Sequence, residues 1–193
     1  MATNYANGLE ITVVDDSDYV GWAAAATRVG EIYMHDIKSM VANVIATCCV
    51  GSNKYKRIAR LNILDHGNPE GFQLGGDWIS MGSFPAAAIE LVKLRPYFAK
   101  GGMVHLQHCQ IGQNKLLIVK LAQLLRVQVY AGTGDQNPIY RVNLLGTGPI
   151  PFENYVVASP DGSCKLSMRP ENFDSGDLQI PTIVTPYSVT IDL

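Results

Sequence analysis

Two short runs of the chain carry the side chains best suited to nucleophilic chemistry. The first run, Leu61–Gly67, ends on His66 followed by a glycine. The second run, Met103–Gln110, reaches Cys109 near its end. An imidazole beside a thiol increases the thiolate fraction at neutral pH, and the protonated imidazole can then donate to a leaving amine. Such a pair cleaves an acyl bond through a covalent thioester, so the two runs predict a His66–Cys109 catalytic dyad.

Both reactive residues follow apolar segments of the kind that form strands buried on both faces of a parallel sheet. Cys109 lies 43 positions after His66, which leaves room for a loop and for the crossover helix that joins two parallel strands. Because neighbouring parallel strands end at the same edge of a sheet, we expect the imidazole and the thiol to lie together there. The backbone N–H groups of Gly67 and Cys109 are then the expected donors of an oxyanion hole.

The remaining elements follow from hydrophobic periodicity and from turn residues. Their order predicts a doubly wound α/β fold, in which helices flank a mainly parallel sheet. We expect residues 1–150 to form this domain and residues 151–193 to form a short β-rich C-terminal appendage packed on it. The expected strands cover 9–14, 58–64, 103–109, 127–131 and 188–193, the expected helices cover about 20–50, 85–98 and 114–125, and the expected hairpins cover 72–79 and 155–168.

Composition and charge narrow the class of protein. Of the 193 residues, 47% are hydrophobic and 17% are charged. This length and this share of hydrophobic residues are sufficient for one domain with a full core. The net charge of −2, without a block of like charges, argues against a nucleic-acid partner. The one basic cluster, Lys54–Arg57 with Arg60, is expected in a solvated loop.

No apolar stretch reaches the roughly 18 residues that a membrane span needs, so no membrane partner is expected. The first residues also lack the basic and apolar regions of a secretory signal. These features predict a cytoplasmic location, or export by a route that needs no signal peptide.

The four cysteines follow neither a disulfide pattern nor a metal pattern. Two of them are adjacent and no C-x-x-C pair exists, which is typical of a chain with reduced thiols. His105, His108 and Cys109 are close in sequence, but neighbouring positions of a strand face opposite sides and cannot converge on one ion. The glycine-rich loop at 132–138 lacks the lysine of a phosphate-binding loop. We therefore expect no metal and no cofactor.

The residues around Cys109 also resemble a known family. Gln107-His108-Cys109-Gln110, with His66-Gly67 upstream, is similar to the signature of caspase-like (clan CD) cysteine peptidases, Q-A-C-[RQG]-G with a histidine about 50 residues before it. His108 replaces the usual alanine, and Ile111-Gly112 stands where one glycine is expected. The likeness covers roughly residues 9–135 and extends to a caspase-like domain of unknown function near the front of large bacterial surface proteins. The resemblance implies a caspase-like fold near metacaspases and gingipains, and a cysteine endopeptidase that acts on a protein or peptide substrate.

The resemblance also implies where substrate specificity lies. In caspase-like peptidases the primary pocket draws on the loop after the first strand, on the residues before the cysteine, and on the loop after the next strand. The matching positions here are Asp15, Asp16, Gln107 and Asp135. Acidic side chains at these positions favour arginine or lysine on the amino side of the cut bond, whereas caspases proper use arginine to select aspartate.

Two alternatives to a peptidase remain at this point. Cys109 can be an ordinary buried thiol, and Asp15 and Asp16 can cap a helix. The chain is then a catalytically silent caspase-like module that serves in the recognition or assembly of a bacterial surface or secreted system. An amidotransferase-type cysteine hydrolase fits less well, because in those enzymes the histidine follows the cysteine along the chain. The oligomeric state stays open.

Overall fold

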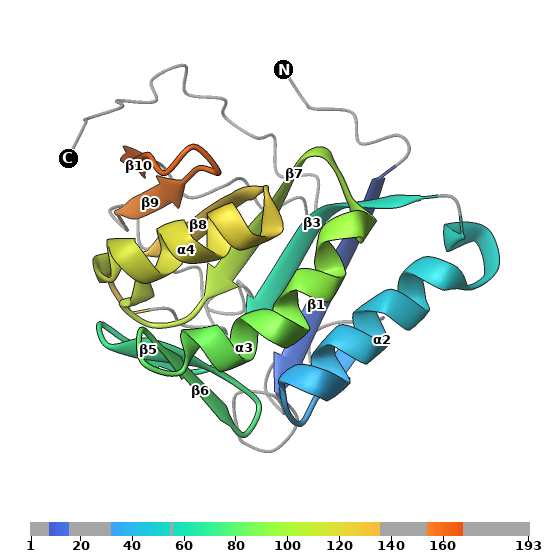
Figure 1. The fold of residues 1–193 in the computed structure, drawn as a ribbon, viewed down its shortest axis with the longest axis horizontal. Helices are drawn as coiled ribbons and strands as arrows, with labels where there is room; N and C mark the ends of the chain where they lie inside the picture. The colour runs from blue at the N-terminus through green and yellow to red at the C-terminus, as the bar shows by residue number, and fades with distance from the viewer. Residues whose placement is uncertain (1–7, 16–31, 55, 136–153, 168–193) are drawn as a thin grey trace, which may run out of the picture.

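A seven-stranded sheet forms the centre of the computed structural model, which describes residues 8–15, 32–54, 56–135 and 154–167 (Figure 1). Its strands are β1 (Gly8–Asp15), β2 (Ile32–Met34), β3 (Arg57–Leu64), β7 (Phe98–Gln107), β8 (Gln128–Gly132), β9 (Tyr155–Ala158) and β10 (Cys164–Ser167). They lie side by side in the order β10-β9-β8-β7-β3-β1-β2. The strands from β8 to β2 are parallel to one another, and β9 and β10 add an antiparallel hairpin at the edge of β8.

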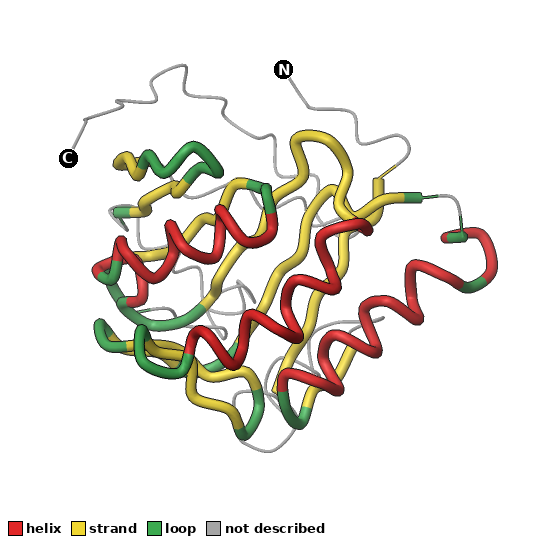
Figure 2. Tube along the Cα trace, in the orientation of Figure 1, coloured by secondary structure: helices red, strands yellow, loops and turns green. Residues whose placement is uncertain are grey.

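The α-helices of the described residues cover one face of this sheet (Figures 1 and 2). They are α2 (Ile37–Cys49), α3 (Phe84–Leu91) and α4 (Lys115–Leu125), and the short 3₁₀ helices are η1 (Gly51–Asn53), η2 (Val92–Tyr97) and η3 (Ile111–Gln113). Apolar side chains of the helices and of the facing strand positions, such as Val13, Ile63 and Leu106, form one core. The predicted α/β class, with a mainly parallel sheet flanked by helices, is confirmed.

Local sequence explains how α4, which follows the candidate site, begins and ends. The side chain of Asn114 accepts a hydrogen bond from the N–H of Leu117 at 3.2 Å and so caps the helix. Five buried side chains then recur at helical spacing: Leu117, Ile118, Leu121, Ala122 and Leu125. The helix ends at Arg126, whose φ of 59° is left-handed.

Replacing Asn114 by alanine is expected to lower the free energy of unfolding by about 1 kcal/mol, because the N–H of Leu117 loses its partner. Asn114→Asp keeps the acceptor oxygen and is expected to change stability little. Urea denaturation followed by circular dichroism measures both. An equal loss in the two variants would assign the effect to the other bond of Asn114, from Nδ2 to the carbonyl of Glu70 at 3.3 Å.

A small antiparallel sheet lies just beyond the end of β3. It consists of β4 (Gly67–Asn68), β5 (Gly71–Leu74) and β6 (Asp77–Ser80), in that order. The predicted hairpin at 72–79 is therefore confirmed. Its tip is fixed to the start of α2 and to the residues just before it, because the carboxylate of Asp77 accepts from Ile37 N–H at 3.0 Å and Gly76 N–H donates to the carbonyl of His35 at 2.7 Å.

The opposite face of the large sheet carries a buried polar layer. Residues of a strand alternate between faces, so Arg60 and Asn62 lie on the side away from Leu61 and Ile63. Arg60 is only 1% exposed, and its Nε donates to Asn62 Oδ1 at 2.8 Å. The prediction of a solvated Arg60 is wrong, because the strand begins at Arg57 and carries Arg60 into the sheet.

The same layer fixes the tautomer of His105. Arg60 Nη2 lies 3.0 Å from Nδ1 of this ring, and Gln107 Nε2 lies 3.3 Å from it. Both groups are donors, so Nδ1 must accept and the imidazole is neutral with its proton on Nε2. That Nε2 faces the hydroxyl of Tyr155 at 3.5 Å. His105 therefore has a structural role in joining β3, β7 and β9.

Of the helix predicted over 20–50, Ile37–Cys49 is helical as expected, but residues 32–34 are not. Residues 32–34 form β2, which pairs in parallel with β1, and α2 begins only at Ile37. Asp36 and Ser39 form a capping box, which sets this start. Residues 20–31 lie outside the described residues, as does the predicted strand at 188–193.

The crossover helix also ends earlier than predicted. It is α-helical to Leu91 and continues as η2, which contains Pro96, a residue without an N–H. Strand β7 then begins at Phe98 and not at Met103. Among the described residues, no helix has both the length and the apolar character to cross a membrane.

Candidate functional site

The register of the sheet sets His66 and Cys109 at the same level of its carboxyl edge. Strands β3 and β7 are parallel neighbours, and Leu64 pairs with Gln107. His66 and Cys109 each lie two positions beyond this pair. A Cβ atom on Gly67 would lie 2.8 Å from the Cβ of His108 and 3.0 Å from the carbonyl oxygen of Cys109. The loop that carries His66 is therefore in direct contact with the loop that carries Cys109, and both predicted oxyanion donors lie on these loops.

The turn after Cys109 is held in an uncommon conformation. Gln110 has a φ of 57°, which non-glycine residues seldom adopt. Its N–H donates to the carbonyl of Gly134 at 2.8 Å, and its Nε2 donates to Asp135 Oδ1 at 2.8 Å. These bonds fasten the thiol loop to the loop after β8. Cys109 is half-buried and His66 is exposed, so solvent reaches both.

The backbone of His66 is anchored at both of its polar groups. Its N–H donates to Asp65 Oδ1 at 2.7 Å, and its carbonyl accepts from Gln73 N–H at 2.9 Å. The second carboxylate oxygen of Asp65 accepts from Gly75 N–H at 2.8 Å. Both anchors thus lead to the small β4-β5-β6 sheet. The backbone of His66 is therefore fixed by hydrogen bonds, although its imidazole ring is exposed.

His108, next to the thiol, is fully buried and has a structural role. Its Nε2 donates to the carbonyl of Gln73 at 2.9 Å, and its ring meets that of Phe72 edge-on, with centroids 5.1 Å apart. Burial lowers the pKa of His108 to about 4, so the imidazole is neutral at neutral pH. Its Nδ1 has no hydrogen-bond partner among the described residues. His108 therefore ties the thiol loop to the hairpin without carrying charge.

Two carboxylates lie at the carboxyl ends of β1 and β3. Asp15 is 3% exposed and Asp65 is 4% exposed. Burial raises the pKa of Asp65 to about 6, and the charge of Asp15 adds to the rise, while hydrogen bonds from the N–H groups of His66 and Gly75 oppose it. Strand order reverses between β1 and β3, because β2 lies on one side of β1 and β3 on the other. Open α/β sheets place their ligands at such a reversal.

The predicted specificity residues are spread along this edge. Asp15 ends β1 and is buried beside Asp65, and Asp16 lies outside the described residues. Gln107 is 4% exposed and its amide faces His105, whereas the carboxylate of Asp135 binds the Gln110 amide. The amide of Gln107 and the carboxylate of Asp135 are thus each engaged by a neighbouring side chain, and Asp15 lies near a second carboxylate.

Sequence reasoning missed the residues that hold His66 in place. Asp65, Gln73 and Gly75 supply the anchors, and none of them stood out beside the reactive pair. The available signal was the polar Asp65 directly between an apolar strand and His66. Its partners could not be found from sequence, because Gly75 N–H approaches only through the fold of the hairpin.

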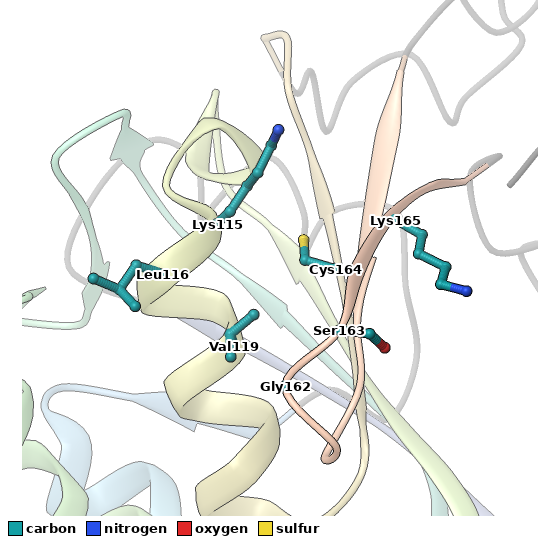
Figure 3. A pocket seen from close by; sticks show the side chains of 7 residues that line it. All are labelled: Lys115, Leu116, Val119, Gly162, Ser163, Cys164 and Lys165. Atoms are coloured by element: carbon teal, nitrogen blue, oxygen red, sulfur yellow. The ribbon is translucent and has the colours of Figure 1, made fainter. Parts of the chain in front are cut away.

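Two other kinds of site, a metal site and a ligand pocket, have less support in the structure. No group of three or more His, Cys, Asp or Glu side chains within the described ranges could hold a metal ion. A groove of about 420 Å³ lies between α4 and the β9–β10 hairpin, lined by Lys115, Leu116, Val119, Gly162, Ser163, Cys164 and Lys165 (Figure 3). Val119 and Cys164 face it, whereas Lys165 points away from α4 (Figure 3). None of the predicted site residues lines this groove.

The described residues define an α/β protein whose parallel sheet carries a thiol and an imidazole on touching loops at its carboxyl edge. The chain belongs to a family described as a domain of unknown function (DUF4347), whose model matches residues 15–137. The matched range includes both His66 and Cys109. No curated protein matches the chain, and no solved structure matches it.

Proposed function

We propose that this protein is a caspase-like cysteine endopeptidase, with Cys109 as the nucleophile and His66 as the general base. The observation that carries the proposal is the contact between the two loops, which follows from the pairing of Leu64 with Gln107 and from the close approach of Gly67 to Cys109. His66 is exposed and Cys109 is half-buried, so solvent reaches both groups.

The reaction proceeds in two steps. His66 takes the proton of the Cys109 thiol, and the thiolate attacks the scissile carbonyl carbon while the backbone N–H groups of Gly67 and Cys109 stabilise the oxyanion. The imidazolium then protonates the leaving amine, the C–N bond breaks, and a thioester to Cys109 remains. Water, deprotonated by His66, attacks the thioester and releases the acid and the thiol.

Acidic residues near the edge support a preference for basic substrates. Asp15 ends β1, Gln107 ends β7 and Asp135 lies in the loop after β8, and Asp16 follows Asp15 in the sequence. A carboxylate binds an arginine or lysine side chain by a charge-assisted hydrogen bond. The proposed substrate class is therefore a peptide with arginine or lysine before the cut bond.

Labelling by iodoacetamide, mapped by mass spectrometry, tests the dyad at each cysteine separately. At pH 7 a free thiol is a few per cent thiolate, so full ionisation by His66 is expected to accelerate Cys109 by about 10- to 30-fold over the exposed Cys49. His66→Ala is expected to remove this advantage. His35→Ala, which removes another exposed imidazole, is the matched control and is expected to leave the rate unchanged.

Two outcomes contradict the proposal. Equal rates for Cys109 and Cys49, or a fast rate that persists in His66→Ala, would favour the catalytically silent module. Fluorogenic peptides that end in Arg, Lys or Asp then test specificity, with turnover of the basic peptides expected to be lost in Cys109→Ala. Equal cleavage of the Arg and Asp peptides would overturn the proposed preference.

A further inference from the structure

The carboxylate of Asp65 has two backbone donors and lies at the junction of two elements. Its Oδ1 accepts from His66 N–H at 2.7 Å and its Oδ2 from Gly75 N–H at 2.8 Å. The side chain is 4% exposed, so water does not compete freely for these oxygens. A carboxylate can satisfy two such donors at once, whereas an amide side chain of the same shape offers one acceptor.

We propose that Asp65 is a positioning residue, whose carboxylate holds the backbone of His66 against the hairpin tip and so sets where the imidazole stands relative to Cys109. The inference rests on the function proposed above and adds a residue that the reactive pair does not include. A displacement of about 1 Å in a reacting group can cost about 100-fold in rate, so such a hold has large consequences.

The hairpin tip, to which Asp65 binds through Gly75 N–H, is itself held in place by the segment around the start of α2. Gly75 has a φ of 60°, and a Cβ atom there would meet the backbone of His35 and lie 2.6 Å from the nitrogen of Asp36. The next residues fasten the tip from the other side, Gly76 to the carbonyl of His35 and Asp77 to Ile37 N–H. Asp65 therefore connects His66 to a turn that is itself fixed to the start of α2.

Burial and the charges around Asp65 determine the pH range in which its carboxylate is ionised and binds both N–H groups strongly. Asp15 at the end of β1 and His66 beside it are the charged groups that act on it, and Asp77 lies two residues beyond Gly75. Burial raises the pKa of Asp65 to about 6, so the carboxylate is present at neutral pH and gains a proton on mild acidification. A protonated carboxyl keeps one full acceptor and loses the charge that strengthens both bonds.

Asp65→Asn and its matched control Asp161→Asn separate positioning from a general effect on stability. Both variants remove a carboxylate that accepts a backbone N–H, but Asp161 accepts from Ser163 in the turn between β9 and β10, away from His66 and Cys109. At pH 7.5 we expect Asp65→Asn to slow iodoacetamide labelling of Cys109 about 10-fold, with the labelling of Cys49 unchanged. Asp161→Asn is expected to keep the wild-type rate at both cysteines. Equal slowing in the two variants would assign Asp65 a structural role only and overturn the proposal.

The pH profile gives a second readout that stability alone does not move. In the wild type, Cys109 reactivity is expected to fall by an additional step near pH 6, where the Asp65 carboxylate gains its proton and its bonds to the N–H groups of His66 and Gly75 weaken. Asp65→Asn is expected to lack this step. Identical profiles would overturn the inference.

A measurement on the wild type covers the case in which Asp65→Asn does not fold. The amide proton shifts of His66 and Gly75 are expected to titrate together with a midpoint of about 6, and different midpoints would contradict the shared carboxylate. If wild-type Cys109 reacts no faster than Cys49, the proposed function fails and this inference fails with it. A His66-dependent rate that Asp65→Asn leaves intact overturns this inference alone.

Discussion

Gly75→Ala is expected to lower the free energy of unfolding by about 3 to 4 kcal/mol. A left-handed residue with a Cβ costs about 1 to 2 kcal/mol, and forcing an atom into a filled space costs about 1 to 3 kcal/mol more. Gly75 has a φ of 60°, and its added Cβ would collide with the carbonyl group of His35. These are backbone atoms, which cannot turn aside as a side chain does.

Gly51→Ala is the matched control for this variant. Gly51 has a φ of 53°, but no atom lies within 4 Å of the place of its Cβ. The free energy of unfolding of Gly51→Ala is expected to fall by only about 1 to 2 kcal/mol, the cost of a left-handed residue with a Cβ. Urea denaturation at pH 7.5 compares the two, and equal losses would show that the hairpin tip can move away from His35.

The Gly75 variant also bears on the candidate site. Its N–H is the second partner of the Asp65 carboxylate, so a displaced tip is expected to slow the labelling of Cys109 in Gly75→Ala and not in Gly51→Ala. Labelling of the exposed Cys49 serves as the internal reference in both.

The second large effect concerns acid stability and His108. The pKa of this ring falls from 6.5 to about 4 in the folded protein, chiefly through burial. The unfolded chain therefore binds the proton first as the pH falls. The stabilisation is complete above about pH 6.5 and is lost between pH 6.5 and 4, and its total is about 3 kcal/mol.

His108→Gln removes this titration and keeps a donor for the carbonyl of Gln73. We expect the difference in unfolding free energy between variant and wild type to shift by about 2 to 3 kcal/mol in favour of the variant between pH 7.5 and 4.5. His35→Gln, at an exposed position, is the control. Parallel pH curves for His108→Gln and wild type would contradict the neutral buried state of His108.

The contribution of Asp65 to the free energy of unfolding changes in the opposite direction over the same pH range. Its pKa is raised from 3.8 to about 6 in the folded protein, so the folded state takes up the proton first and gains stability as the pH falls from 6 towards 3.8. The effects of Asp65 and His108 offset each other in the wild type. A comparison of each variant with the wild type, and not the wild-type curve alone, therefore reveals either one.

Sequence patterns predicted the main elements because those patterns are local. The apolar runs before His66 and Cys109 identified two buried parallel strands, and the periodicity of 114–125 identified α4 with its Asn114 cap. The glycine pair in the hairpin indicated its turn. These features depend on residues a few positions apart, for which spacing and turn chemistry are sufficient.

The sequence-based predictions were wrong at residues whose structure depends on partners far away along the chain. Residues 32–34 have no pattern that separates a short strand from a helix, and they form β2 because β1 accepts them in parallel register. Arg60 belongs by composition to the basic cluster before it. It is buried because Asn62 and His105, on its own and the neighbouring strand, supply its partners.

For the candidate site, the sequence alone determined the two reactive side chains, the strands that precede them and the distance between them along the chain. Tertiary structure decided the contact of Gly67 with the Cys109 loop, the burial of His108 and the two bonds of Asp65. The physical reason is that hydrogen bonds and burial depend on which loops the sheet order brings together. A chain can encode a thiol and an imidazole locally, but only the folded sheet determines what surrounds them.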